Sequence, residues 1–205
     1  SFQNSCKILL KAYVLGISTL DTAEAYGDAH QVIGEFHKSN SSFKFDVITK
    51  IPHGADISNI EVKVEEYCKE LHVDFLQVLM FHSFDSYLNN LTIIERLNKI
   101  KSQGLIKEIG VSVYTNDQIE TLLLDDSITV VQMPFNLLDN ESIRGDLMQK
   151  LKDKDKIIHT RSAFLQGLFF KERSDTNAVF QKLLPELNEI KKISRFSLHL
   201  LELCR

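Results

Sequence analysis

The stretch Phe75–His82, with the sequence FLQVLMFH, carries the clearest information about the fold. It is an almost continuous apolar run that ends on a polar residue, with little alternation of apolar and polar positions. Such a run is typical of a strand buried on both faces, as in a parallel sheet covered by helices. Five further runs of this kind occur along the chain: Gly16–Leu20, Phe45–Ile48, Ile106–Val113, Ile128–Met133 and Lys156–His159.

Segments with helical periodicity alternate with these predicted strands. They are Cys6–Leu15, Ala29–His37, Ser58–Leu71, Leu88–Ser102, Asn116–Leu124 and Ser142–Asp153, and one more helix is expected after the sixth strand. Strict alternation of strand and helix predicts an α/β fold in which each connection between parallel strands is a helix. About six βα units fill the chain, so we expect a single domain over residues 1–205.

Three residues indicate where the predicted helices begin and end. Ser58 and Asn116 are predicted as N-caps, and Glu61 stands three residues after Ser58, the spacing of a capping box. Gly104 follows the segment Leu88–Ser102 and is predicted to end that helix at the C′ position.

The composition is that of an ordinary globular protein, with 43% hydrophobic and 25% charged residues, 8 glycines and 3 prolines. The 24 basic and 28 acidic residues give a net charge of -4, which argues against nucleic acid as a partner. No apolar run approaches the roughly 20 residues of a membrane span, so we expect no membrane association. The three cysteines, Cys6, Cys68 and Cys204, lack a Cys-x-x-Cys spacing, which favours a cytoplasmic location and disfavours a zinc site.

Polar residues stand at the ends of the predicted strands. In chain order they are Asp21, Lys50, His82, Ser112, Gln132 and Arg161. In an α/β barrel, catalytic groups come from the carboxyl ends of several strands, so this set outlines one functional rim. The alternative for any single residue is that a strand simply ends where a polar loop begins.

The residues Asp21, Tyr26, Lys50 and His82 together suggest proton chemistry on a carbonyl group. A lysine at the end of a buried strand needs a carboxylate partner, and Asp21 closes the neighbouring strand. The ammonium is expected to lower the pKa of the Tyr26 phenol, which would make Tyr26 a general acid near neutral pH. His82, one strand further, is expected to donate a hydrogen bond to a carbonyl oxygen.

Several motifs resemble those of the aldo/keto reductase superfamily in order and spacing. They are Asp21–Gly27 with Gly34, Ile48–Lys50, Leu79–His82, Gly104–Ser112 and Val131–Asn136, and they span nearly the whole chain. The resemblance implies a (β/α)8 TIM barrel and the NADPH-dependent reduction of an aldehyde or ketone to an alcohol by hydride transfer. It also implies a catalytic tetrad, in which Tyr26 donates the proton, Lys50 and Asp21 tune it, and His82 orients the carbonyl.

The resemblance implies NADPH as the cofactor, with NADH also open. The family binds it across the barrel rim without a Gly-x-Gly-x-x-Gly motif, and this chain has no such motif. Ser112 and Gln132 are expected to hold the nicotinamide carboxamide. The chain departs from the family pattern at Val113, which stands where an Asn commonly follows the Ser.

The segment Arg161–Gly167 resembles the family loop that lies along the nicotinamide and pyrophosphate. From this segment Arg161, Ser162 and Phe164 are expected to contact the cofactor. Arg161 is a second departure, because many members of the family carry an aromatic residue there that stacks on the nicotinamide.

The chain is shorter than a complete barrel, which typically has eight strands and about 250 residues. By the resemblance, the family's first and eighth strands are absent, and the start without Met or a signal pattern suggests a missing upstream segment. The eighth unit usually holds the 2′-phosphate of the cofactor, so these residues do not determine the choice between NADPH and NADH. We expect an incomplete barrel with two unpaired edges and poor activity on its own.

Two other functions are kept as alternatives. Lys50 could form a Schiff base with a carbonyl substrate, as in aldolases, although pairing with Asp21 would oppose this. The departures at Val113 and Arg161 would also fit a barrel that binds or regulates without catalysis. His53 has no partner at metal-ligand spacing, so we assign no metal.

Overall fold

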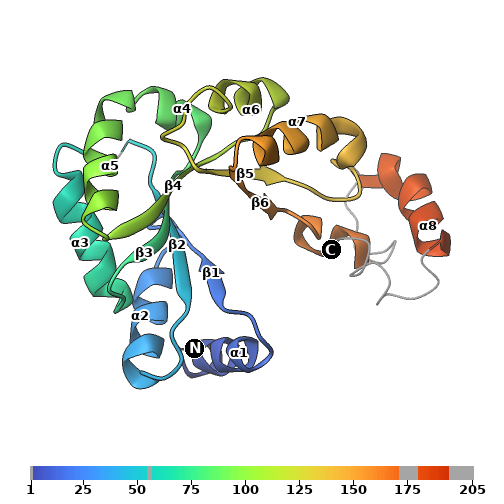
Figure 1. Ribbon diagram of the computed structural model, residues 1–205. Coiled ribbons are helices and arrows are strands. Elements are labelled where there is room, and N and C mark those ends of the chain that lie inside the picture. Colours follow the sequence, from blue (N-terminus) through green and yellow to red (C-terminus); the bar gives the residue numbers. More distant parts are fainter. Residues whose placement is uncertain (1, 55–56, 171–179, 194–205) are drawn as a thin grey trace.

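The computed structural model describes residues 2–54, 57–170 and 180–193. Its centre is one parallel sheet with the strand order β1-β2-β3-β4-β5-β6. The strands are β1 (Thr19–Asp21), β2 (Asp46–Ile51), β3 (Leu76–Phe81), β4 (Ile106–Ser112), β5 (Val130–Pro134) and β6 (Ile157–Arg161). The α/β fold predicted from the sequence is therefore confirmed, and Figure 1 shows the sheet curling into an open half-barrel.

Helices α2 to α7 cover the convex side of this sheet (Figure 1). The α-helices are α1 (Phe2–Val14), α2 (Ala29–Ser39), α3 (Ile60–Leu71), α4 (Phe84–Leu88), α5 (Ile94–Ser102), α6 (Asn116–Leu122), α7 (Glu141–Asp153) and α8 (Leu184–Ile193). Short 3-10 segments, η1, η2 and η4, span Leu91–Ile93, Leu165–Phe170 and Phe180–Leu183. In the part of the chain that the structure describes, these helices leave the concave side of the sheet uncovered.

Alternation along the strands gives the sheet an outer and an inner face. Residues of the outer face pack under the helices in the main core, among them Val47, Ile51, Leu79, Phe81, Ile109, Val111, Val131 and Met133. Residues of the inner face form a smaller apolar cluster of Ile48, Val78, Met80 and Val130. The inner face is therefore apolar up to the level at which the polar strand-end residues begin.

Close packing of α2 on α3 depends on Gly34. A Cβ atom added at this position would lie 1.9 Å from the backbone oxygen of Glu70. Only glycine therefore permits this approach of the two helices. The contact explains why a glycine follows the Asp21–Gly27 motif.

Several strand boundaries differ from the predicted ones. β1 begins at Thr19 instead of Gly16, because Gly16 forms the turn that ends α1: it has φ +92° and its N–H donates to Tyr13 O at 2.9 Å. β2 runs on to Ile51, beyond the predicted end at Ile48, and β6 runs on to Arg161. These extensions place Lys50 and Arg161 inside strands.

The predicted helix Leu88–Ser102 is divided into three pieces. α4 ends at Leu88, a 3-10 turn follows, and α5 begins only at Ile94. The amide of Asn90 donates to Ser86 O at 2.6 Å, which is the carbonyl that a continuous helix would give to the backbone N–H of Asn90. Asparagine side chains compete with helical hydrogen bonds in this way, so the break has a local cause.

The predicted N-caps are each wrong by one residue. Asn59, not Ser58, precedes α3, and its side chain makes no capping hydrogen bond. Thr115, not Asn116, caps α6 and forms a complete capping box with Gln118. The C′ role of Gly104 is confirmed, since it has φ +86° directly after the C-cap of α5.

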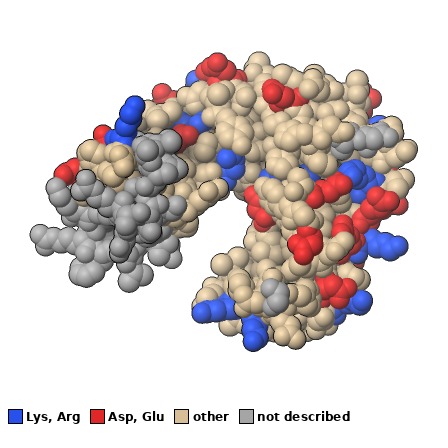
Figure 2. Space-filling model, turned by 180° about the vertical axis from the view of Figure 1, so that it is seen from behind, with Lys and Arg blue, Asp and Glu red and all other residues tan. Residues whose placement is uncertain are grey.

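The two outer strands, β1 and β6, have no further strand beside them in the part of the chain that the structure describes. Figure 2 shows the resulting hollow from behind and acidic and basic side chains interspersed over the visible face. Within the same described residues, no helix combines the length and the apolar composition needed to cross a membrane.

Candidate active site at the carboxyl ends of the strands

The polar residues at the strand ends share the inner face of the sheet. The register pairs Lys50 with Met80, Ser112 with Gln132 and Pro134 with Arg161. In a parallel sheet, paired residues point to the same side, and so do residues two apart in one strand. All of these side chains therefore lie on the inner face, next to the inner apolar cluster. The structure thus brings the predicted strand-end residues to one rim: Asp21, Lys50, His82, Ser112, Gln132 and Arg161.

The Lys50 ammonium lies at the centre of this rim. It forms an ion pair with the Asp21 carboxylate and donates a second hydrogen bond to Thr22 O at 3.1 Å. The Lys50 side chain is only 3% exposed, whereas that of Asp21 is 39% exposed. The predicted pairing of Asp21 with Lys50 is therefore confirmed, and it compensates the burial of the lysine charge.

Tyr26 and His82 lie close to each other, and Tyr26 lies close to this pair. The Tyr26 and His82 rings meet edge to face with centroids 5.9 Å apart, and Lys50 Nζ is 5.5 Å from the Tyr26 ring centroid. The Tyr26 side chain is half exposed, so its phenol faces the hollow of the half-barrel. The four residues of the expected tetrad are thus close together.

The pKa of Tyr26 changes in the direction opposite to the prediction. Partial burial raises the pKa of the phenol, the Asp21 carboxylate raises it further, and Arg161 opposes both. The expected lowering was wrong because partial burial and the nearby Asp21 carboxylate outweigh the positive charge beside the phenol. Tyr26 therefore remains a protonated phenol at neutral pH.

Two imidazoles on the inner side of the sheet are neutral at pH 7. Burial lowers the pKa of His82, and the neighbouring His53 and Lys50 lower it further; the His53 ring stacks on His82 at 5.0 Å. Burial also lowers the pKa of His159, which lies in β6 and pairs with Gln132. His159 was missed by the sequence reasoning, although it stands two residues before Arg161, the spacing that places it on the same face.

Of the residues expected at the cofactor, Ser112 and Gln132 are both buried at the carboxyl ends of β4 and β5. Gln132 does not close its strand, since β5 continues to Pro134. Its amide nitrogen donates to Asp21 Oδ2 at 2.7 Å, which links β5 to β1 across the half-barrel. Gln132 therefore joins the Asp21–Lys50 pair directly.

The remaining expected cofactor contacts follow directly after β6. Ser162 has φ +60°, in the left-handed region, and Phe164 is 38% exposed. The guanidinium of Arg161 lies 4.1 Å from the Tyr114 ring centroid, and its Nη2 donates to Val113 O at 3.1 Å. The two positions that depart from the family pattern, Val113 and Arg161, therefore contact each other.

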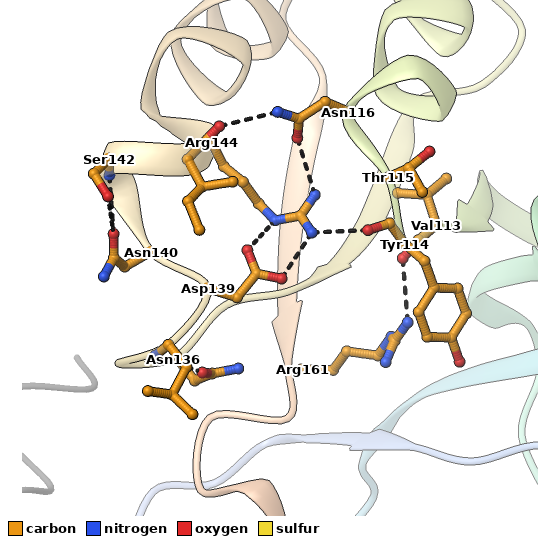
Figure 3. A network of polar contacts seen from close by, with 12 residues as sticks. Val113, Tyr114, Thr115, Asn116, Asn136, Asp139, Asn140, Ser142, Arg144 and Arg161 are labelled. Atoms are coloured by element: carbon orange, nitrogen blue, oxygen red, sulfur yellow. Dashed lines mark hydrogen bonds and ion pairs between the residues drawn. The ribbon is translucent and has the colours of Figure 1, made fainter. Parts of the chain in front are cut away.

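A buried arginine on the other side of the same loop holds it in place (Figure 3). Arg144, from α7, forms a two-pronged ion pair with Asp139 and donates to Tyr114 O at 2.8 Å and to Asn116 Oδ1 at 3.3 Å. The Arg144 side chain is only 5% exposed. Arg144 was not singled out from the sequence, where an arginine within a predicted helix gives no sign of burial.

The rim also opens sideways into a groove of about 390 Å³ between α1 and α2. Asp21 and Tyr26 are among its polar lining residues, and most of the others are apolar, among them Ile8, Leu9, Leu20, Val32 and Ile33. A ligand at the rim therefore has space beside the Tyr26 phenol.

Several buried polar atoms at the rim have no hydrogen-bond partner among the described residues. They are Thr22 Oγ1, His82 Nδ1, His159 Nδ1 and Arg161 Nε. Buried polar groups in proteins are nearly always hydrogen-bonded. The rim therefore fits a polar ligand, such as a nicotinamide cofactor with a carbonyl substrate, that supplies the missing partners.

Curated proteins match part of this chain in sequence. The chain is 22% identical over 184 residues to the NADH-specific methylglyoxal reductase of Escherichia coli, covering 78% of this chain and 56% of the relative. It is 28% identical over 127 residues to the D-arabinose 1-dehydrogenase of Saccharomyces cerevisiae, covering 56% and 38%. The chain thus spans about half the length of the curated relatives it matches.

Solved structures share the fold. An aldo-keto reductase of Bacillus halodurans in its holo form matches with a TM-score of 0.69 at 20% identity, over 87% of this chain and 62% of that one. An aldo-keto reductase of Klebsiella pneumoniae in complex with NADPH matches with a TM-score of 0.65 at 20% identity, over 83% and 63%. The open half-barrel therefore corresponds to part of the barrel in these enzymes.

A model of the aldo/keto reductase family matches residues 1–203, nearly the whole chain. The resemblance found in the sequence motifs and the parallel half-barrel agree with this match. The chain belongs to the aldo/keto reductase family.

Proposed function

We propose that this chain carries the catalytic half of a reductase that converts an aldehyde or ketone to an alcohol, with NADPH as the hydride donor. The observation that carries the proposal is the cluster of Tyr26, His82 and the buried Asp21–Lys50 pair at one rim. Membership of the aldo/keto reductase family supports the same chemistry.

Tyr26 is the proposed proton donor to the carbonyl oxygen. Its raised pKa keeps the phenol protonated, so it acts as an acid and not as a base at neutral pH. His82 has a lowered pKa and a buried Nδ1 without a partner. A neutral imidazole at this place can donate one hydrogen bond to the carbonyl and so fix its orientation beside Tyr26.

Lys50 and Asp21 act as a neutral pair behind the phenol. The ammonium of Lys50, 5.5 Å from the Tyr26 ring, favours the negative charge that develops as the proton leaves. Asp21 holds this ammonium in place and is itself held by Gln132. The network therefore holds the Lys50 ammonium near Tyr26, while the Asp21–Lys50 pair as a whole adds no net charge to the site.

NADPH, when bound, supplies the hydride. In this proposal Ser112 and Gln132 hold its carboxamide, while Arg161, Ser162 and Phe164 lie along it. One relative is named for NADH and one matched structure contains NADPH. NADPH is the proposed cofactor, and titration with both nucleotides decides the preference.

Replacing Tyr26 with Phe tests the mechanism. We expect turnover of a panel of aldehydes to fall by at least about 100-fold, because the proton donor is lost. NADPH binding, followed by nicotinamide fluorescence, should persist. Tyr13→Phe makes the same chemical change on α1, in contact with Phe43 and Phe45, and should leave turnover unchanged.

Near-normal turnover of the Tyr26→Phe variant would contradict this mechanism. Nicotinamide binding without turnover of any carbonyl compound would favour the binding or regulatory barrel. Trapping of a substrate on Lys50 by borohydride would favour a Schiff-base aldolase, although the ion pair with Asp21 engages the amine as an ammonium, which is not nucleophilic.

A further inference from the structure

The arginines of the described residues differ in how their charge is balanced. Arg96 forms a two-pronged ion pair with Glu61 on the outer helices, and Arg144 forms one with Asp139. Arg161 forms no ion pair with any carboxylate in the described part of the chain. Its guanidinium is therefore the one arginine charge described here without a protein counterion.

The surroundings of Arg161 hold the guanidinium plane in place. The plane lies 4.1 Å from the centroid of the Tyr114 ring, Nη2 donates to Val113 O at 3.1 Å, and Nη1 contacts Ser162 Oγ at 3.4 Å. A guanidinium has five N–H donors, so these contacts leave donors unused, and Nε is buried without any acceptor. Stacking on a tyrosine and spare donors are both typical of arginines that bind planar anions.

The position of Arg161 relative to the reacting groups is equally specific. Arg161 is paired with Pro134 at the end of β6, two residues beyond the Gln132–His159 pair, and Gln132 donates to Asp21 Oδ2 at 2.7 Å, so the Arg161–Tyr114 pair lies on the same rim as the group that includes the proton donor. Lys50 is neutralised by Asp21. Among the described residues, the rim therefore carries one positive charge without a carboxylate partner, which matches a single negative charge on a ligand.

We propose that Arg161 and Tyr114 form a subsite for a carboxylate on the carbonyl substrate, so that the preferred substrates are aldehydes or ketones that also carry a carboxylate. This inference rests on the proposed reductase function and names its substrate class. A carboxylate is planar and carries one negative charge, as the single stacked guanidinium requires. A phosphate dianion on the cofactor shares this chemistry in part but calls for more positive charge than the rim holds.

The loop that carries Tyr114 is suited to this role because it cannot move freely. Arg144 binds the Tyr114 carbonyl next to the Val113 carbonyl that Arg161 binds (Figure 3), and the capping box at Thr115 fixes the start of α6. Val113 is fully buried, so its carbonyl offers Arg161 a rigid acceptor. The Arg161 guanidinium is therefore already oriented before a ligand binds, which lowers the entropy lost on binding.

The test compares two aldehydes of the same shape, para-carboxybenzaldehyde and its neutral amide, para-carbamoylbenzaldehyde. For each, kcat/KM is measured in the native protein, Arg161→Gln, Arg161→Lys and Arg96→Gln, the last removing an arginine charge outside the rim. We expect Arg161→Gln to lower the ratio of the two kcat/KM values by about tenfold. Arg161→Lys should recover part of this ratio, and Arg96→Gln should leave it unchanged.

Binding of benzoate and benzamide, followed by ligand-observed NMR, needs no turnover. If no carbonyl compound is reduced but benzoate still binds better than benzamide through Arg161, the subsite stands and the reductase proposal fails. An unchanged carboxylate preference in Arg161→Gln would overturn the subsite. Weaker NADPH binding in this variant with an unchanged carboxylate preference would also overturn it and leave Arg161 as a cofactor contact alone.

Discussion

The two parts of the rim balance their charges differently. On β1 to β3, the buried ammonium of Lys50 is paired with Asp21 within the site itself. On β4 to β6, the pairing occurs behind the site, where Arg144 binds Asp139, while Arg161 in front of it pairs with no carboxylate of the described residues. The first part is thus an internally neutral proton-transfer group, and the second is a rigid frame that presents a free positive charge.

This difference teaches how a lysine and two arginines in the same half-barrel serve different purposes. A buried ion pair adds little to stability because desolvation offsets the attraction, so the Asp21–Lys50 pair is best explained by chemistry. Arg144 instead satisfies several acceptors of one loop at once and so maintains its shape. The two parts should therefore respond to substitution in opposite ways, one in activity and the other in stability.

The largest effect is expected from Lys50→Met. Methionine fills the buried position and removes the charge, while Asp21 keeps Gln132 and solvent as partners. We expect turnover to fall by at least about 100-fold, because the charge next to Tyr26 is lost. The unfolding free energy, measured with urea, should change by no more than about 1 kcal/mol. A loss of stability as large as that of activity would show that Lys50 is mainly structural.

Arg144→Met should have the reverse profile. Removing this guanidinium leaves the Asp139 carboxylate and the Tyr114 carbonyl without their partner. We expect the unfolding free energy to fall by about 3 kcal/mol, since one half of a buried ion pair is left behind. Arg96→Met breaks an exposed pair on α3 and α5 and should have a much smaller effect. Equal losses in the two variants would contradict the structural role of Arg144.

Much of the fold could be predicted because the sequence patterns that specify its strands and helices are local. The apolar runs and their polar ends predicted six strands and their order, and Gly104 correctly ended a helix. The predicted helix boundaries were wrong where a side chain competes with the backbone for a hydrogen bond. The Asn90 amide, for example, donates to the Ser86 carbonyl, and the predicted helix is divided there. Such competition depends on geometry that no spacing in the sequence specifies.

The site was predictable where each residue closes a strand, and less so elsewhere. Asp21 and Lys50 pair as expected, because neighbouring strands bring their ends together. The pKa of Tyr26 was predicted in the wrong direction, since the sequence showed the ammonium but neither the burial of the phenol nor the effect of Asp21 on it. The contact of Gln132 with Asp21 depends on the curl of the sheet, which no local pattern reveals.

A smaller effect concerns pH and the buried imidazoles away from the Arg144 network. Burial lowers the pKa of His30, His37, His82 and His159 below the ordinary value of about 6.5. The unfolded chain therefore binds protons at these residues before the folded chain does, and stability falls as the pH drops below about 6.5. We expect urea midpoints to be level between pH 7 and 8 and to decline towards pH 5.

His37 is the clearest contributor to this decline. Its Nε2 accepts the Phe45 N–H at 3.1 Å, so its Nδ1 carries the proton and donates to Leu71 O at 2.8 Å. Protonation would remove the acceptor for Phe45. Replacing His37 with Gln, which keeps one donor and one acceptor without titrating, should make the decline shallower. An unchanged slope in this variant would assign the decline to other groups.

The smallest expected effect comes from the capping box beside Tyr114. Thr115 accepts the Gln118 N–H, and the Gln118 side chain accepts backbone N–H groups in return, so Thr115→Ala removes half of the box. We expect a loss of about 1 kcal/mol in unfolding free energy, the usual effect of losing an N-cap. The change should be local: amide hydrogen exchange should accelerate in the first turn of α6 and not in α3, whose Asn59 makes no side-chain cap. Thr115→Ser keeps the hydroxyl and should restore slow exchange. Thr115→Ala could also lower the carboxylate preference as far as Arg161→Gln does. In that case the Tyr114 loop would depend on this cap more than on Arg144. The division of the rim into a reacting part and a rigid frame would then have to be redrawn.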